Sequence, residues 1–467
     1  MPKSYAIMRK NRSFECSEGT GTAMKNYYTP NDFKNLSTDS EMIQAAVDEA
    51  AKYGVRTVIP RYNERRGECL WELDEGIKLY TGSYVTLDSC YIRLGDDTVI
   101  HFFENSVADT ETDWWNPEHR QYDITLKGEG CVVLDGGKHN GVFESCFNIY
   151  DDNGKFVKKT EFRGFKGAYV NRGLQFRNVE RITVQGIRMV NCRYWGMNFE
   201  LCSEGHVSDI TFESLNHVPN QDGIDVRVGC HNFLIENISG KTGDDTIALT
   251  NFGLPEAVGE GLDLDIHDIM IRNIRSYVTG RCDMIRLLNR GGAKIYNVQI
   301  SGVIDMTPEG EEHRPLAAIR IGDLNNYPFR LNLAGETRNI TVRDVISRAR
   351  FGVYVANSLT DSVFDNIMMT SEGGIGMYFN GCDVRNVFID KLTYNSVSCV
   401  PESDRGYTHL HHKVKIDTLA AIYFNNSTAE NVNIRNLVGG KNLDCLIGSN
   451  REIVLNIDGE STAVGAE

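Results

Sequence analysis

Two short acidic segments hold the side chains best suited to acid–base chemistry. The first reads PNQDGID and contains Asp222, and the second reads GDDTIAL and contains Asp244 and Asp245. Carboxyl groups that crowd together cannot all ionise freely, so at least one of them keeps its proton. A proton-holding carboxyl beside an ionised one is what hydrolysis of a glycosidic bond requires. The alternative is that each aspartate caps its own turn and is solvated.

A recurring strand pattern determines whether these two segments can meet. Stretches such as NVERITVQGI, HVSDITFESL, IHDIMIRNI and TRNITVRDV alternate apolar and polar residues with the period of two that is typical of strands. Their irregular spacing, without a helical period, suits the coils of a solenoid that carries inserted loops. The sequence therefore predicts an all-β fold, a right-handed single-stranded parallel β-helix. Residues one coil apart then stack about 4.8 Å apart, which would crowd all three aspartates into one patch.

A second set of strands, interleaved with the first, ends in asparagine each time. Stacked asparagines can form a ladder in which each amide donates to one neighbour and accepts from the other. The predicted ladder consists of Asn251, Asn289, Asn357, Asn380 and Asn425. The alternative is that asparagine is simply common in turns.

The stretch STDSEMIQAAVDEAAKYG predicts a helix that caps the N-terminal end of the solenoid. Thr38 and Glu41 fit a capping box, and Gly54 fits the helix end. The apolar face would consist of Ile43, Ala46, Val47 and Ala50. We predict an N-terminal segment with the cap helix at residues 1–60 and one continuous β-helix catalytic domain at 61–467.

Composition restricts the class of protein. The chain of 467 residues has a formal net charge of −15, which disfavours nucleic acid and anionic membranes as partners. No apolar run is long enough for a membrane span, and the N-terminus has no apolar run of the kind found in signal peptides. The twelve cysteines are scattered, as expected for free thiols in a reducing compartment. We therefore predict a cytoplasmic protein.

The acidic segments and their surroundings resemble glycoside hydrolase family 28, the polygalacturonase-like β-helix enzymes. NQDGID is similar to the family's Asn-Thr-Asp motif, with Gln221 in place of threonine, and GDD matches the second motif without change. The resemblance implies an inverting mechanism in which Asp244 is the general acid while Asp222 and Asp245 activate water. It also places Asn220 at the substrate.

Two further motifs of that family are altered. The region after the paired aspartates lacks the Gly-His-Gly motif, and His267 nearby lies in a repeat strand, where a structural role competes with substrate binding. The Arg-Ile-Lys motif corresponds best to IRLLN, with Arg286 as the arginine and Leu288 in the lysine's place. Because these groups bind galacturonate on the leaving-group side in that family, the departures leave the substrate of this chain open.

Other side chains are candidates for substrate binding. Arg286 and Arg320 share a strand phase and could hold a substrate carboxylate between them, unless they are ordinary surface arginines. Trp195 lies in CRYWGMNF, ahead of the first acidic segment, and could line the cleft, and Asp225 follows that segment closely. The run from His409 to His412 has no acidic or cysteine partner at a metal-binding spacing, so we predict no metal and no cofactor.

These observations predict a glycoside hydrolase that acts on an oligosaccharide or glycoside from plant cell walls. The expected substrate is of a pectic type, either with or without a uronic acid. A homo-oligomer is compatible with the sequence. The first rival is another β-helix carbohydrate enzyme: a fructan fructotransferase, a difructose anhydride hydrolase or a polysaccharide lyase. The second rival is a β-helix that binds carbohydrate without catalysis.

Overall fold

The computed structural model describes most of the chain. Side chains and backbone are described for residues 25–96, 98–108, 113–138, 140, 172–214, 220–252, 261–279, 282–289, 292–311, 314–322, 332–370, 374–394, 418–440 and 443–465, and the backbone alone for 149–150 and 156–157. The predicted histidine run at 409–412 lies outside these residues.

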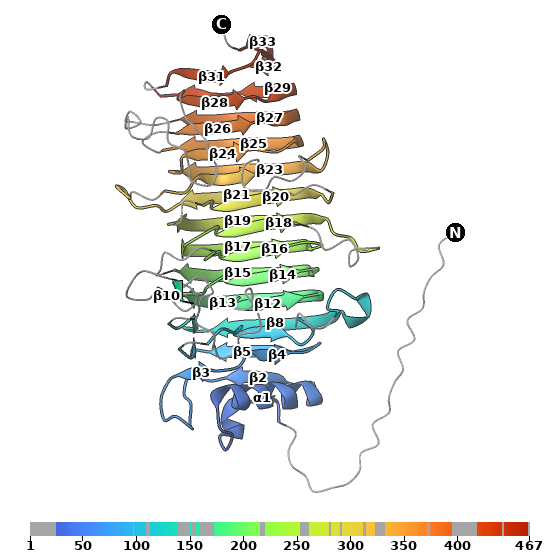
Figure 1. Ribbon diagram of the computed structural model, residues 1–467, viewed down its shortest axis with the longest axis vertical. Coiled ribbons are helices and arrows are strands. Elements are labelled where there is room, and N and C mark those ends of the chain that lie inside the picture. The colour runs from blue at the N-terminus through green and yellow to red at the C-terminus, as the bar shows by residue number, and fades with distance from the viewer. Residues whose placement is uncertain are drawn as a thin grey trace, which may run out of the picture.

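The chain winds into a right-handed parallel β-helix whose coils stack along the long axis of Figure 1, which confirms the predicted fold. One parallel sheet has twelve described strands: β4 (Ile77–Leu79), β7 (Phe103–Asn105), β12 (Leu174–Arg177), β14 (Met197–Glu200), β16 (Ile224–Arg227), β18 (Ile247–Asn251), β20 (Ile285–Asn289), β22 (Ala317–Ile321), β24 (Phe351–Val355), β26 (Ile375–Asn380), β28 (Ala420–Asn425) and β31 (Cys445–Ser449). We call it the twelve-stranded sheet.

The remaining coil strands form a sheet of nineteen described strands: β1 (Tyr27–Tyr28), β2 (Arg56–Ile59), β3 (Trp71–Leu73), β5 (Tyr84–Asp88), β6 (Tyr91–Leu94), β8 (Gln121–Glu129), β9 (Val133–Asp135), β13 (Val179–Val190), β15 (Ser203–Glu213), β17 (His231–Thr242), β19 (Ile266–Val278), β21 (Ile295–Asp305), β23 (Thr337–Ser347), β25 (Leu359–Met369), β27 (Asp383–Tyr394), β29 (Thr428–Arg435), β30 (Val438–Gly439), β32 (Ile453–Ile457) and β33 (Glu460–Val464). We call it the nineteen-stranded sheet. A separate hairpin joins β10 (Ile149–Tyr150) and β11 (Phe156–Val157).

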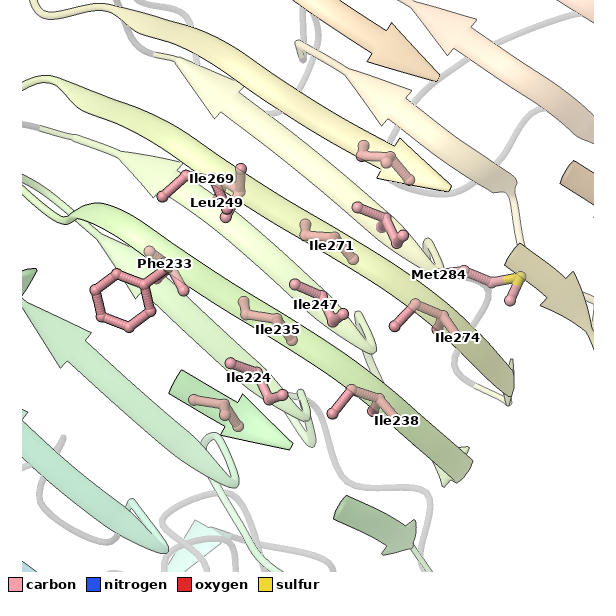
Figure 2. Close-up of a cluster of buried hydrophobic side chains, with 14 of the residues drawn as sticks. Ile224, Phe233, Ile235, Ile238, Ile247, Leu249, Ile269, Ile271, Ile274 and Met284 are labelled. Atoms are coloured by element: carbon pink, nitrogen blue, oxygen red, sulfur yellow. The ribbon is translucent and has the colours of Figure 1, made fainter. Parts of the chain in front are cut away.

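Rows of stacked aliphatic side chains fill the interior of the coil (Figure 2). The period of two turns every second residue inward, so Ile235 of β17 pairs with Ile271 of β19, and Ile224 of β16 with Ile247 of β18. All four are fully buried, and burial of each such side chain stabilises the fold by about 1.5–3 kcal/mol. This continuous row fixes the register of the strands and therefore the height at which each polar residue stands.

Asparagine ladders are present, but only some of the predicted asparagines belong to them. Of the five predicted asparagines, Asn425 donates to Asn380 over 2.8 Å, and the row continues through Asn450. Asn251 and Asn289 donate instead to backbone carbonyls, because neighbouring turns come within reach of their amides. Two further rows run along bends of the nineteen-stranded sheet, where left-handed residues with φ of 51–55° bond from coil to coil: Asp268, Asn297 and Asn339 in one row, and Asp361, Asn386 and Asn431 in the other.

Both ends of the described coil are covered. The predicted cap helix is present as α1 (Asp39–Tyr53), with the capping box between Thr38 and Glu41 and a left-handed Gly54 at its end. At the other end β33 turns back and pairs antiparallel with β32. Short 3₁₀ helices lie at Pro30–Phe33 and Pro117–His119. The boundary between 1–60 and 61–467 stays a prediction.

The composition led to expectations about the cysteines and about membrane-spanning segments. Nine described cysteines are free thiols, of which five are buried. In the part of the chain that the structure describes, no helix is long and apolar enough to cross a membrane.

Candidate active site

Three aspartates occupy the same place on three consecutive coils, just ahead of strands of the twelve-stranded sheet. Asp222, Asp245 and Asp283 each stand two residues before an isoleucine, and the register of β16, β18 and β20 pairs these isoleucines with one another. The N–H of Gly223 donates to the carbonyl of Asp245 over 2.8 Å, and that of Thr246 donates to the carbonyl of Asp283 over 3.2 Å. Since neighbouring strands lie about 4.8 Å apart, the three aspartates form one row.

Asp244 links the two acidic segments directly. The backbone N–H of Asn220 donates to its Oδ2 over 3.1 Å, and the N–H of Asp245 donates to its Oδ1 over 2.9 Å. Asn220 has a left-handed backbone, with φ of 62°, which asparagine tolerates better than most residues. The N–H groups of Gly243 and Asp244 in turn donate to the carbonyl of Gln221. The two segments therefore meet in one site, as the coil length predicted.

A repeated ion pair holds the second and third aspartates of the row. Asp245 Oδ1 accepts the N–H of Asp283 over 2.7 Å, and its Oδ2 accepts Nη1 of Arg286 over 3.1 Å. One coil further on, Asp283 accepts the N–H of Ala317 over 3.0 Å and Nη1 of Arg320 over 3.1 Å. Both aspartates are almost fully buried, so each carboxylate is compensated by one guanidinium and one peptide group.

Asp222 lacks both of these partners. The residue that would supply the arginine is Ala248, which occupies on β18 the position that Arg286 occupies on β20. The N–H that would donate to it, that of Asp245, is bound to Asp244 instead. Oδ1 of Asp222 is buried and makes no hydrogen bond to any described residue. Among the described residues, Asp222 is therefore the carboxyl of the row without an ion-pair partner.

Burial and mutual repulsion raise the pKa values of the carboxyl groups of the site. Burial, followed by the negative charges of Asp244, Asp225 and Asp245, raises the pKa of Asp222 well above its ordinary value. Burial and the adjacent Asp245 raise the pKa of Asp244. Burial also raises the pKa of Asp245, although Arg286 opposes the shift. These shifts favour the protonated form of the carboxyls, whereas Arg286 favours ionisation, and a cluster with both influences can perform acid–base chemistry.

Asp225 adds a fourth carboxyl. It lies on β16 in register with Asn198 of β14 and with Ala248 of β18, and only 2% of its surface is exposed. Burial raises its pKa to about 8, with Asp245 and Asp244 adding to the shift and Arg227 and Arg172 opposing it. Its Oδ2 has no hydrogen-bond partner in the described chain. Asp225 is thus a buried acid between the aspartate row and a group of arginines.

Trp195 stands beside those arginines. It lies one coil before Asp222, whose carbonyl accepts the N–H of Gly196 over 2.8 Å. The Cζ atoms of Arg172 and Arg227 lie 4.7 and 4.5 Å from the centroid of its ring, and the ring stacks on Tyr194. Trp195 is 8% exposed. It therefore supports two guanidinium groups next to the carboxyls, and its predicted place in the lining of a substrate cleft stays a prediction.

Arg320 is placed in register with Arg286, as predicted, but its surroundings differ. It is 1% exposed, pairs with Asp283, and its Nε donates to the carbonyl of Gly322 over 3.2 Å. Arg286 is more accessible and contacts Asp245. The expected two-arginine pocket is therefore divided: Arg286 faces the carboxyl cluster, and Arg320 supports it from the next coil.

His267 is not brought to the carboxyl cluster. It lies at the start of β19, where its ring stacks between His231 and Tyr296 at centroid distances of 4.9 and 4.8 Å, and it pairs with Asp268. The register aligns it with His231, which follows β16, whereas Asp222 precedes β16. A whole strand of the twelve-stranded sheet separates the two corners. The position of His267 therefore argues against a substrate role for this residue.

Several residues of the site escaped the sequence reasoning. Asp283 had a usable signal, because DGI, DTI and DMI repeat the pattern Asp-x-Ile at the start of three successive coils. Cys282, whose thiol hydrogen-bonds Asp244, had none. Arg172, Arg177, Arg227 and Glu200 were hidden because their meeting depends on the register of β12, β14 and β16.

Asp244, Asp245 and Cys282 are close enough to hold a metal ion. Two carboxylate oxygens and the Sγ atom lie within 4.8 Å of one another. Zinc accepts both ligand types, but its structural sites take four ligands and its catalytic sites take three plus water. Asp244 and Asp245 also bond to Asn220 and Arg286 respectively, so the predicted absence of a metal stays a prediction.

Comparison with known proteins supports the family resemblance at this site. The model of glycosyl hydrolases family 28 matches residues 144–253, a segment that includes Asp222, Asp244 and Asp245. The resemblance seen in the sequence is therefore confirmed for this segment. No curated protein matches the sequence significantly.

Solved structures share the fold at low sequence identity. The family 28 exopolygalacturonase of Yersinia enterocolitica is 15% identical, with a TM-score of 0.51 over 94% of this chain and 80% of that chain. The surface adhesin PfbA of Streptococcus pneumoniae is 10% identical, with a TM-score of 0.54 over 94% of this chain and all of that chain. The polygalacturonase from Erwinia carotovora ssp. carotovora is 14% identical, with a TM-score of 0.50 over 83% of this chain and 99% of that chain. These likenesses establish the parallel β-helix and leave the activity to be argued from the site.

Proposed function

We propose that this protein is a glycoside hydrolase that cleaves a pectin-type, uronate-containing oligosaccharide or glycoside by inversion. The observation that carries the proposal is the meeting of Asp222, Asp244 and Asp245 from two coils, where burial and mutual repulsion favour the protonated form of the carboxyls and Arg286 opposes this. The family match over residues 144–253 supports the same reaction class.

Asp244 is proposed as the general acid. It is the most exposed of the three aspartates, and burial together with the charge of Asp245 favours its protonated form. Its proton would pass to the oxygen of the glycosidic bond as the bond to the anomeric carbon breaks. The two backbone N–H groups on its oxygens would then stabilise the carboxylate that remains.

Asp222 and Asp245 are proposed to activate the water. A water on the opposite face of the sugar would attack the anomeric carbon and give its proton to a carboxylate. Oδ1 of Asp222 makes no hydrogen bond to a described residue and would accept that proton when Asp222 is ionised. Asp245, held by Arg286 and by the N–H of Asp283, would keep a fixed negative charge beside the developing positive charge of the sugar.

Product analysis tests the proposed reaction. The purified protein is incubated with homogalacturonate, rhamnogalacturonan and fructan oligosaccharides, and products are followed by reducing-end assay, ultraviolet absorbance and proton NMR of the anomeric signal. A hydrolase gives new reducing ends with inverted configuration and no absorbance. Ultraviolet-absorbing products would identify a lyase, and a non-reducing cyclic product would identify a fructotransferase. Binding without any product would favour the non-catalytic alternative.

A further inference from the structure

Three arginines surround one glutamate next to the carboxyl cluster. Glu200 accepts Nε of Arg177 over 2.5 Å and stands 3.5 Å from Nε of Arg227. Arg172 is 8% exposed, and its Nη1 donates to the neutral side chain of Gln175 over 2.7 Å. We call Arg172, Arg177 and Arg227 the arginine cluster. It carries three positive charges around one ionised glutamate.

The charges in this region do not balance. Burial opposes ionisation of Glu200, but Arg177, Arg172 and Arg227 outweigh it and lower its pKa to about 2, so it contributes one negative charge. In the described part of the chain, Asp225 is the other carboxyl that interacts with the cluster, and its pKa of about 8 leaves it mostly protonated at neutral pH. Burial and the neighbouring guanidiniums lower the pKa of Arg172 to about 10, which still leaves it charged. Among the described residues, a surplus of about two positive charges remains in a region from which water is largely removed, an arrangement that favours a bound anion.

Hydrogen-bonding groups in the same place are also unused. Nε of Arg172, Nε of Arg227 and Nε2 of Gln175 are buried and make no hydrogen bond to any described residue. The pair of Asp283 and Arg320 offers a contrast, because there one carboxylate matches one guanidinium. In a structural ion pair of this kind the two charges cancel. The arginine cluster, in contrast, has more positive charges than negative ones and has N–H donors that bind no described residue.

The position of the cluster relates it to the aspartates. Asp225 on β16 interacts with Arg227 and Arg172 and also with Asp245 and Asp244. Arg172 lies just ahead of β12, two strands before β16, and Asp245 lies just ahead of β18, the strand after β16. Arg286 lies beyond Asp245, two strands after Arg227, and so about 10 Å further along the sheet. The carboxyl cluster therefore has guanidinium groups on both sides.

We propose that Arg172 and Arg227, supported by Trp195, form a binding site for the carboxylate of a uronic acid residue of the substrate. This deepens the proposed function, on which it rests: the substrate carries uronates on both sides of the bond to be cleaved, one beside Arg286 and one at the arginine cluster. Guanidinium groups suit this ligand because their paired donors match the two oxygens of a carboxylate.

A binding experiment tests this site without using catalysis. The Asp244→Asn variant is titrated with D-galacturonate and with D-galactose at low and high salt, and tryptophan fluorescence is followed because Trp195 contacts both arginines. We expect galacturonate to change the fluorescence and to bind at least tenfold more tightly than galactose, with affinity falling as salt is added. Adding Trp195→Phe should remove the signal, which would assign it to this site.

Single substitutions show whether galacturonate binds at the arginine cluster or beside Arg286. Arg227→Gln should weaken galacturonate binding at least tenfold, and Arg227→Lys should recover part of it, while Arg272→Gln, an exposed change of the same charge on β19, should have no effect. Arg286→Gln should leave the Trp195 signal in place. Circular dichroism confirms that each variant is folded.

Equal binding of galactose and galacturonate, or unchanged galacturonate binding by a folded Arg227→Gln, would overturn the proposal. Selective binding by a protein that hydrolyses nothing would leave this site standing and refute only the proposed function.

Discussion

The backbone N–H of Asn220 and the carboxylate of Asp244 are joined by a hydrogen bond of 3.1 Å that spans two coils of the β-helix. This bond makes one site out of segments that lie apart in the sequence. It also orients the half-buried Asp244, so the proposed roles of the aspartates lead to specific expectations for single substitutions.

The leaving group distinguishes the proposed acid from the proposed base. Asp244→Asn should lower kcat/KM on an ordinary oligosaccharide about 10²–10⁴-fold, the usual contribution of general acid catalysis. On an aryl glycoside whose leaving group needs no proton, the loss should be much smaller. Asp222→Asn should lose activity on both substrates, since it acts on the water. Equal losses for the two variants on both substrates would contradict these roles.

Removing Arg286 should move the pH profile. Its positive charge lowers the pKa values of Asp222, Asp244 and Asp245, so Arg286→Gln lets all three rise. Both limbs of the kcat/KM profile should then shift to higher pH, because each limb reports one of these carboxyls. The measurement is kcat/KM across pH on one substrate, with Arg272→Gln as the control. A profile that keeps its position would mean that the titrating groups lie elsewhere.

Asp225 should reduce stability at neutral pH. Its folded-state pKa of about 8 lies above the ordinary value of 3.8, so its contribution is most favourable below pH 4 and is lost as the pH rises to about 8. Asp225→Asn should therefore stabilise the protein at pH 7, by on the order of 2–4 kcal/mol, and the advantage should vanish near pH 4. Urea unfolding of both proteins at the two pH values gives the comparison. A variant that is less stable at pH 7 would refute the account of this residue.

The pair of Asp283 and Arg320 should behave as a structural unit. Asp283→Leu leaves a buried guanidinium without its carboxylate and should cost about 3–5 kcal/mol. The double variant Asp283→Leu with Arg320→Met should recover most of that loss, because apolar side chains can replace a buried pair. A double-mutant cycle by urea unfolding measures the coupling. Additive effects of the two substitutions would show that the pair contributes no interaction.

Local patterns in the sequence were sufficient for the fold and for the meeting of the acidic segments. Thr38, Glu41 and Gly54 mark the cap helix by local chemistry, and the period of two in the repeats determines which residues face inward. Asp222 and Asp244 lie one coil apart, so counting residues along the chain was enough to predict that they meet.

Longer-range features needed the register. The partners of Asp245 come from the next coil, and the arginine cluster assembles across three strands. Inserted loops vary the length of each coil, so spacing alone does not reveal which arginine stands beside which carboxylate. His267 illustrates the same limit, since its distance along the chain resembles that of a site residue but its corner of the coil differs. Cytoplasmic location and oligomeric state stay predictions.

The most direct test of the central claim is release of reducing ends from a homogalacturonate trisaccharide by the wild-type protein and by Asp244→Asn, with both shown to be folded. We predict hydrolysis by the wild type and a loss of at least about 100-fold in the variant, as removal of a general acid implies. Hydrolysis that the variant retains in full would show that the aspartates joined by Asn220 are not the catalytic acid, and the proposed mechanism would be wrong.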